Sequence, residues 1–392
     1  MTLNEHELNP VVTAVPPSGI RRFFDIASTI KDVISLGIGE PDFVTPYHIR
    51  DAVINSLLDG ETQYTGNYGL LELREEIAYY MQARFNVTYA PDSEILVTVG
   101  ASEAIDIVMR GLLAPGDEVV VPDPGYVSYA PCVQFAGGKP VPVATSADNE
   151  FQLTAEALEK AITSKTKALL LAYPANPTGA VMPLEQLEEV AEVVLRHNLI
   201  VISDEIYAEL VYGGFKQHAI ASLPDMRERT VTINGFSKAF AMTGFRLGYI
   251  CAPTWLLKNP AKVHQYTIMC ASRPSQVAAL QALRRAREDG CQDIEMMRTS
   301  YDRRRRLMYN AFTDMGLTCF EPRGAFYAFP SVKNTGMDSG TFCERLLKEQ
   351  SVVCIPGDAF GACGDGHIRC CYATDIDKLT EAFRRIRVFL NA

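Results

Sequence analysis

The sequence is poor in tryptophan, with a single residue, and has no excess of positive charge. Its 37 Lys and Arg residues stand against 47 Asp and Glu residues, which gives a formal net charge of -10. Nucleic acids and anionic membranes are bound by clustered Lys and Arg side chains, so neither is expected as a partner. The one dense basic run is the four arginines at 303–306, in a stretch with helical periodicity. We expect this run to form a solvated helix face.

Long apolar runs and regular cysteine spacings are also missing. No stretch of about 18 uninterrupted apolar residues is present, and the start, MTLNEHE, has no basic segment followed by an apolar block. We therefore expect no membrane span, no secretory signal and a cytoplasmic location. The ten cysteines predict reduced, mostly buried thiols. Cys354, Cys363, Cys370 and Cys371 lie near His367, but their separations match no common zinc-ligand spacing, so no metal site is expected.

What the sequence does contain, between about residues 90 and 250, is an alternation of short apolar runs with amphipathic segments. Several runs are nearly continuous Val, Ile and Leu, which is typical of strands covered on both faces. Helical periodicity lies between them, for example over 184–197. The pattern predicts an α/β fold, with a three-layer α/β/α large domain around a mainly parallel sheet. The expected strands are 95–99, 118–122, 167–172, 200–204, 231–234 and 248–252.

The sequence changes character after about residue 255. Helical patterns are followed by short strand patterns and a terminal helix, which predicts a smaller α+β domain. The first forty residues are expected to add an arm and one strand to it. We therefore predict a large cofactor-binding domain over 41–284 and a small domain formed by 1–40 with 285–392. The expected elements of the second half are helices at 276–287, 301–315 and 377–390 and strands at 325–329 and 367–372.

Polar residues close several of the apolar runs, at the sheet edge where ligands of open α/β sheets bind. The first run leads into Ala101 and Ser102 and then a helix expected over 103–113, and backbone N–H groups at such a helix start suit a phosphate. Ser102 is equally well explained as a helix cap. The third run leads into a turn that projects Asn176, which could be only a turn.

Two further runs lead into ionisable residues. Asp204 ends a buried strand, where an acid needs a partner because an unpaired buried charge is costly. Lys238 lies in a small, apolar loop, and burial lowers the pKa of a lysine and makes it a nucleophile for carbonyls. One ligand suits all these positions if it carries an aldehyde for Lys238, a protonated ring nitrogen for Asp204, and a phosphate for Ser237, Arg246 and the helix start. Pyridoxal phosphate carries all three.

The sequence also resembles the class I/II aminotransferases of the type I pyridoxal-phosphate fold, which include aspartate aminotransferase. The resemblance covers nearly the whole chain and implies an enzyme that transfers an amino group between an L-amino acid and a 2-oxo acid in two half-reactions. It rests on seven motifs in order: GEPDF from Gly39, Tyr64 before Gly69-Leu70 and Leu73-Arg74, NPTG from Asn176, DEIY from Asp204, GFSKAFAMTGFRLG from Gly235, GAFY from Gly324, and Arg369.

The resemblance implies how the cofactor, pyridoxal 5'-phosphate, would be held. Lys238 would bond its aldehyde and later move the substrate proton, and Asp204 would keep its ring nitrogen protonated. Tyr207 and Asn176 would hydrogen-bond the ring oxygen, and Tyr126 would stack on the ring, although Tyr126 could instead be a core aromatic. The phosphate would be held by Ala101, Ser102, Ser237 and Arg246, with Tyr64 reaching in from a second subunit.

The resemblance also implies a substrate end of the site. Arg369 would bind the substrate α-carboxylate through two parallel hydrogen bonds, helped by the backbone near Gly39, although a surface ion pair is the alternative. Ile20 would add an apolar wall, from the segment 18–24 that folds over the pocket mouth. Tyr64 could be an ordinary turn residue; if it completes a neighbour's phosphate site, an isologous homodimer follows.

Side-chain preference is less constrained by the sequence. Glu103 stands where some aspartate-type relatives have a lysine, and its negative charge argues against an acidic substrate side chain. Arg273 could supply a positive charge across the dimer interface, or it could be a structural interface residue. Similarity points to relatives that act on aromatic, aspartate or N-acyl-diaminopimelate-type substrates, without ranking them.

Two other functions compete with transamination. A C–S lyase on the same scaffold would use the same lysine and aspartate, so the motifs do not exclude it. A non-catalytic, cofactor-sensing regulatory module would need an N-terminal helix-turn-helix domain and a basic patch, and the sequence shows neither.

Overall fold

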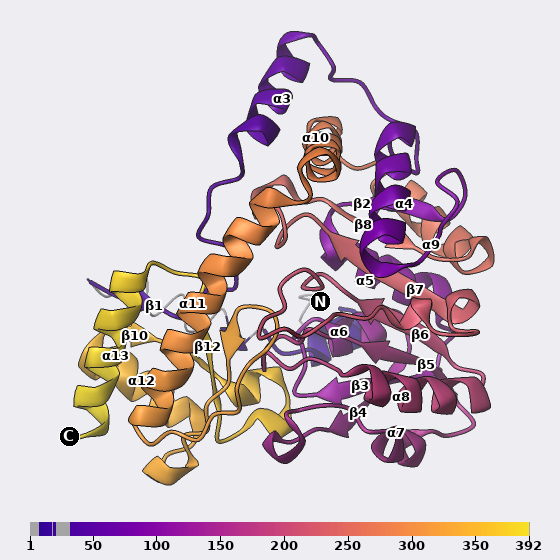
Figure 1. The fold of residues 1–392 in the computed structure, drawn as a ribbon. Helices are drawn as coiled ribbons and strands as arrows, with labels where there is room; N and C mark the ends of the chain where they lie inside the picture. The colour runs from indigo at the N-terminus through magenta and orange to yellow at the C-terminus, as the bar shows by residue number, and fades with distance from the viewer. Residues whose placement is uncertain (1–7, 18, 21–31, 392) are drawn as a thin grey trace, which may run out of the picture.

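The computed structural model describes residues 8–17, 19–20 and 32–391 (Figure 1). A seven-stranded sheet forms the centre of its larger part, in the order β2-β8-β7-β6-β5-β3-β4. The ladders from β4 to β7 are parallel, and β8 runs antiparallel to both of its neighbours. The strands are β2 (Ile95–Thr98), β3 (Glu118–Asp123), β4 (Lys139–Ala144), β5 (Thr166–Leu171), β6 (Ile200–Asp204), β7 (Thr230–Gly235) and β8 (Gly248–Cys251). The predicted mainly parallel sheet is confirmed.

Helices cover both faces of this sheet, because neighbouring residues of its central strands point to opposite sides. In β6, Val201 packs into the cluster under α7 and α8, while Ile202 packs into the cluster under α5, α6 and α9. A further cluster joins α4 and α10 to the β2 and β8 side. The helices are α4 (Leu71–Phe85), α5 (Gly100–Leu112), α6 (Tyr129–Phe135), α7 (Ala155–Ala161), α8 (Leu184–Arg196), α9 (Thr254–Thr267) and α10 (Arg273–Asp289). The three-layer α/β/α arrangement is therefore as predicted.

The smaller part has its own core and its own sheets. Helix α11 runs from the end of α10 into it (Figure 1). The predicted N-terminal strand is β1, which pairs in parallel with β10, and β11, β12 and β9 form an antiparallel sheet. Its elements are β1 (Ile34–Ser35), α11 (Gln292–Asp314), β9 (Tyr327–Ala328), α12 (Ser339–Gln350), β10 (Val352–Val353), β11 (Ile355–Pro356), β12 (Ile368–Cys371) and α13 (Ile376–Leu390). The division at residues 41 and 284 itself stays a proposal.

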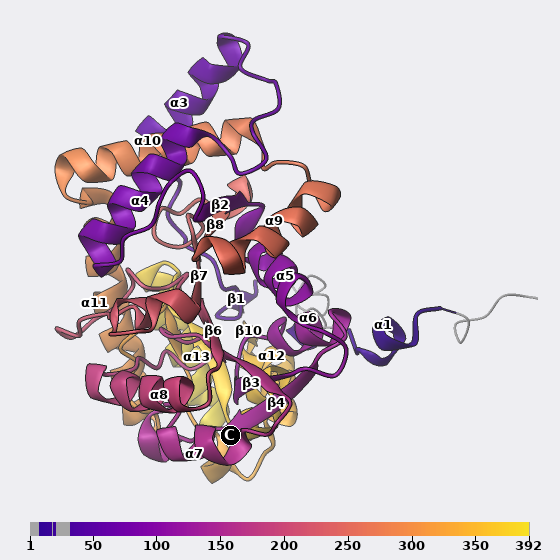
Figure 2. The same cartoon turned by 90° about the vertical axis from the view of Figure 1, so that its right-hand side faces the viewer.

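Two helices lie outside these layers. Helix α3 (Tyr47–Leu58) packs on α10, and the short helix α1 (Pro10–Ala14) projects from the body of the molecule with none of its residues buried (Figure 2). None of the described helices is long and apolar enough to cross a membrane.

Several expected elements differ from the structure. Strand β4 was not predicted, because Pro140 and Pro142 interrupt its apolar pattern. Proline is tolerated in β4 because this strand lies at the edge of the sheet. Helix α5 begins at Gly100, three residues before the expected start at Glu103. The strand expected over 325–329 shortens to β9, two residues long.

The arginine run is not simply a solvated face. Arg305 is 2% exposed, and its guanidinium donates to the carboxylates of Asp302 and Glu321 at 2.8 and 2.7 Å. Arg304 pairs with Asp42 at 2.8 Å. These two side chains join α11 to distant segments, which periodicity along the helix could not reveal.

Candidate active site

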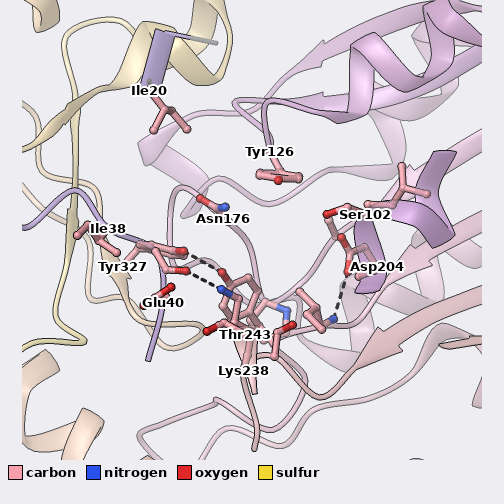
Figure 3. A pocket seen from close by; sticks show the side chains of 18 of the residues that line it. Ile20, Ile38, Glu40, Ser102, Tyr126, Asn176, Asp204, Lys238, Thr243 and Tyr327 are labelled. Atoms are coloured by element: carbon pink, nitrogen blue, oxygen red, sulfur yellow. Dashed lines mark hydrogen bonds between the residues drawn. The ribbon is translucent and has the colours of Figure 1, made fainter. Parts of the chain in front are cut away.

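A pocket lies beyond the carboxyl ends of the parallel strands, where the two parts of the chain meet (Figure 3). Every predicted site residue except Tyr64 lines it, although these residues lie far apart along the chain. The lining residues are Ile20, Gly37, Ile38, Gly39, Glu40, Ala101, Ser102, Ile105, Tyr126, Tyr129, Ala172, Pro174, Asn176, Asp204, Ile206, Tyr207, Ser237, Lys238, Thr243, Arg246, Tyr327 and Arg369.

Lys238 follows β7 and points its amine into the pocket. Its Nζ donates a hydrogen bond to the carbonyl oxygen of Gly39 at 2.5 Å. The same atom lies 5.7 and 5.4 Å from the ring centroids of Tyr207 and Phe326. Desolvation lowers the pKa of the amine to about 8, because burial penalises the charged form. A neutral, nucleophilic amine is therefore accessible near physiological pH.

Asp204 ends β6 with its carboxylate buried and fully engaged. Its Oδ2 accepts a hydrogen bond from the Tyr129 hydroxyl at 2.7 Å, and its Oδ1 accepts from the Ile206 backbone N–H at 3.2 Å. Desolvation raises the pKa of Asp204, while these two bonds and the charge of Lys238 oppose the rise. A cation placed against this carboxylate would favour its ionised form. Sequence reasoning missed Tyr129, because no pattern separated it from a core aromatic.

The start of α5 forms one end of the pocket. Gly100 has φ +77, and a Cβ there would lie 2.9 Å from Nη2 of Arg246. No side chain caps the helix, whose N-cap residue is Val99, so Ser102 is not the cap. The first backbone N–H groups, the Ser237 hydroxyl and the Arg246 guanidinium line the same pocket, a donor set that suits a phosphate.

Arg369, on β12, lies at the other end with a guanidinium that has no carboxylate partner among the described residues. It is 3% exposed, and it donates to Asn176 Oδ1 at 2.9 Å and to the carbonyl oxygen of Gly37 at 2.6 Å. Its carbon Cζ lies 4.6 and 4.8 Å from the ring centroids of Tyr327 and Phe360. Its Nε is buried without a hydrogen-bond partner in the same part of the chain. The surface ion pair is therefore excluded, and an incoming carboxylate would meet an unneutralised cation.

Two tyrosines connect these ends. The hydroxyl groups of Tyr207 and Tyr327 share a hydrogen bond of 2.8 Å. A Cβ on Gly39 would collide with the Tyr327 hydroxyl, which explains the glycine at that position. Tyr327 belongs to the GAFY motif, but no local pattern indicates that its hydroxyl meets Tyr207, 120 residues away.

Other predicted residues lie at the rim of the pocket or away from it. Tyr126 lines the pocket and packs edge-on against Tyr129, so it is not only a core aromatic. Ile20 lines the pocket as predicted, whereas residues 18 and 21–24 lie outside the described residues. Tyr64 is 80% exposed and does not belong to this chain's pocket lining; its predicted contact with a second subunit stays a prediction.

The two residues considered as substrate selectors do not line this chain's pocket. Glu103 turns away and contacts the backbone of Val99 and the ring of His264. Arg273 lies 3.4 Å from Glu61. Glu103 is therefore not placed to contact a substrate side chain in this chain's pocket, and the role of Arg273 across an interface stays a prediction.

Comparison with known proteins agrees with this geometry. Residues 31–386 match the sequence profile of the family described as aminotransferase class I and II. The chain belongs to this family. An aspartate aminotransferase of Pyrococcus abyssi is 48% identical, and an aromatic-amino-acid aminotransferase of Thermococcus litoralis is 46% identical, each over 96% of both chains. The solved aspartate aminotransferase of Thermus thermophilus with maleate matches with a TM-score of 0.92 and 37% identity, covering 97% of this chain and 99% of its own.

This aminotransferase therefore moves amino groups between amino acids and 2-oxo acids, as predicted. The relatives give no support to the C–S lyase alternative. Among the residues that the structure describes, no group of three or more His, Cys, Asp or Glu side chains is placed to hold a metal ion.

Proposed function

We propose that this aminotransferase works with pyridoxal 5'-phosphate bonded through Lys238. The observation that carries the proposal is the meeting, in one pocket, of an amine with a lowered pKa, a buried carboxylate and an uncapped helix start. Each of these features by itself also occurs in proteins that bind no cofactor. Together they match the aldehyde, the ring nitrogen and the phosphate of this one cofactor.

The described residues fit the cofactor in chemistry and in space. Gly100 has no side chain to block the approach of Arg246 to the helix start. Gly248 lets β8 lie close to the same helix start, because a Cβ on Gly248 would lie 2.7 Å from the N atom of Ala101. A phosphate would be held by Ala101, Ser102, Ser237 and Arg246, with Tyr126 against the ring and Asn176 and Tyr207 near its oxygen.

When bound, pyridoxal phosphate supplies an aldehyde that bonds amines and a ring that stabilises negative charge on the substrate carbon. Lys238 is the base that removes and returns the proton at the substrate Cα, and its lowered pKa suits that task. Asp204, held by Tyr129 and Ile206, would pair its carboxylate with a protonated ring nitrogen. Arg369 orients the substrate through its α-carboxylate, so that the Cα proton faces the lysine.

We also propose a cytoplasmic homodimer in which Tyr64 completes the partner's phosphate site. Its exposure on the single chain supports this, since 80% of Tyr64 is uncovered. Co-refolded chains carrying Lys238→Ala and Tyr64→Ala would form hybrid dimers with one undamaged site. Activity that appears on mixing two weak variants supports the shared site; mixtures no better than their components would contradict it.

The cofactor proposal is tested by spectroscopy on the full-length enzyme. The protein with pyridoxal phosphate is expected to absorb visible light, to bleach with borohydride and to yield a tagged peptide containing Lys238. The variant Lys238→Ala is expected to bind the cofactor without the covalent bond and to lose turnover. A colourless protein without a tagged peptide would overturn the cofactor, and near-normal turnover in the variant would overturn the base. A panel of amino acids, mixed one by one with the holoenzyme, then identifies the preferred side chain from the rate of the colour change.

A further inference from the structure

Two side chains outside the pocket, Glu103 and His264, stabilise the start of α5 on the side that faces away from the pocket. Glu103 lies on the first turn of α5, where its Oε2 accepts a hydrogen bond from the backbone N–H of Val99. Its Oε1 lies 2.7 Å from Nδ1 of His264, on α9. The His264 side chain is fully buried, and that of Glu103 is 11% exposed.

Glu103 stabilises the start of this helix without capping it. An N-cap side chain would occupy the N–H groups of the first turn, but Val99 offers no oxygen for them. The N–H groups of Ala101 and Ser102 therefore stay available to an anion. Glu103 fixes the turn through the N–H of Val99, the residue after which the helix begins, and leaves the pocket side of the turn free.

His264 in turn fixes Glu103. A carboxylate only accepts hydrogen bonds, so Nδ1 of His264 donates to it. The other ring nitrogen, Nε2, is buried without a partner among the described residues, so the bond to Glu103 is what orients the ring. Helices α5 and α9 are locked together nearby, because a Cβ on Gly111 would lie 2.6 Å from Pro260. The histidine is therefore carried by a helix that packs closely against α5.

We propose that Glu103 and His264 are positioning residues for the cofactor phosphate. This rests on the proposed use of pyridoxal phosphate. Without the link from α9 through Glu103 to Val99, the first turn of α5 is free to shift. The N–H groups of Ala101 and Ser102 then no longer point at the phosphate. The benefit is geometric, since a carboxylate charge so near a phosphate is itself unfavourable.

Matched variants separate geometry from charge. Glu103→Leu and His264→Leu break the link, whereas Glu103→Gln keeps an acceptor for the Val99 N–H and His264→Asn keeps a donor near the position of Nδ1. The dissociation constants of pyridoxal phosphate and of pyridoxal, which lacks the phosphate, are measured by absorbance titration of the full-length chain after removal of bound cofactor. If the shifted first turn loses one charge-assisted hydrogen bond from its N–H groups to the phosphate, each leucine variant binds pyridoxal phosphate about tenfold more weakly or worse.

Pyridoxal affinity is expected to stay unchanged in all four variants, and the Gln and Asn variants are expected to bind pyridoxal phosphate like the parent. The double leucine variant should lose no more than either single one, because both act through one link. Equal losses of affinity for pyridoxal phosphate and pyridoxal, or additive losses in the double variant, would refute the proposal. They would show that Glu103 and His264 only stabilise the fold. A parent protein that binds neither ligand would instead refute the proposed cofactor.

A second measurement tests the proposal even if the leucine variants do not fold. The phosphorus-31 resonance of the bound cofactor reports directly on the phosphate environment. Glu103→Asp keeps the charge but is one methylene shorter, so it cannot contact both the Val99 N–H and His264. The resonance is expected to shift in this variant relative to the parent holoenzyme, and to shift less in Glu103→Gln, which keeps the link. An unmoved resonance in Glu103→Asp would refute the positioning role.

Discussion

Glu205, the neighbour of Asp204, is a buried acid whose charge the fold does not support. It is 2% exposed, its Oε1 accepts a hydrogen bond from the Ser203 hydroxyl at 2.9 Å, and its Oε2 has no partner among the described residues. Desolvation, with the nearby charge of Asp204, raises the pKa of Glu205 to about 7, from 4.5. The side chain does not line the pocket. Replacing it with glutamine therefore tests the folded state and leaves the site's own groups in place.

The magnitude follows from proton linkage. A folded-state pKa above the unfolded one means that the folded chain holds a proton which the unfolded chain releases, so stability falls as the pH rises from about 4.5 through 7. Relative to acidic pH, where both states hold the proton, this pKa shift lowers the free energy of unfolding of the parent by about 1 kcal/mol at pH 5.5 and by about 3 kcal/mol at pH 8. Glu205→Gln has no such proton. The free energy of unfolding of the variant minus that of the parent should therefore rise by about 2 kcal/mol between pH 5.5 and pH 8.

The assay is urea unfolding of parent and variant holoenzymes at both pH values, at one fixed chain concentration, followed by circular dichroism. Only the change with pH is compared, because the glutamine amide adds its own unpartnered N–H groups at either pH. Glu209→Gln is the matched control, since Glu209 is also buried but receives hydrogen bonds from Arg84 at 2.6 and 2.8 Å. That variant should be less stable than the parent at pH 8. A Glu205→Gln difference that is equal at the two pH values would refute the reasoning.

Three further predictions concern the site and its surroundings. Tyr129→Phe removes the hydroxyl that donates to Asp204 and is expected to lower kcat/KM about tenfold or more, measured by steady-state kinetics at a temperature where the variant is folded. Arg369→Lys keeps the charge but loses the planar pair of donors, so KM should rise for every amino acid alike; a rise confined to one substrate class would contradict binding of the α-carboxylate. Gly361→Ala places a Cβ against the Asp123 carboxylate at φ +132 and should lower the urea midpoint by the equivalent of about 1–3 kcal/mol.

The parts of the fold that the sequence predicted are those encoded by local pattern. Continuous Val, Ile and Leu runs identified the central strands, because burial on both faces excludes polar residues. Strand β4 was missed because its prolines are tolerated only at an edge, and being an edge is a property of the whole sheet. The start of α5 was misplaced because Gly100, in the left-handed region, reads as a turn residue in the sequence.

The site divides in the same way. Lys238, Asp204 and Asn176 were predicted because each lies at or within a few residues of a strand end. The hydrogen bonds of Tyr129 to Asp204 and of Tyr207 to Tyr327 join positions 75 and 120 residues apart. The sequence carries no local signal for such pairs, since any aromatic in an apolar stretch looks like core. They depend on how elements that are distant in the sequence pack against each other, which only the folded chain shows.

The polar contacts across the pocket explain how two of its basic side chains, Lys238 and Arg369, are held without a direct ion pair to an acid. Lys238 donates to the carbonyl of Gly39, and Arg369 donates to the carbonyl of Gly37 and the amide oxygen of Asn176. Neutral oxygens satisfy the N–H donors without cancelling a charge, as a carboxylate would. A carboxylate brought to Arg369 would therefore exchange these neutral partners for charge-assisted bonds, which an uncharged ligand could not form. The Lys238 amine likewise has no carboxylate in direct contact among the described residues, so desolvation outweighs the opposing charges, including that of Glu40, and the pKa of the amine stays lowered.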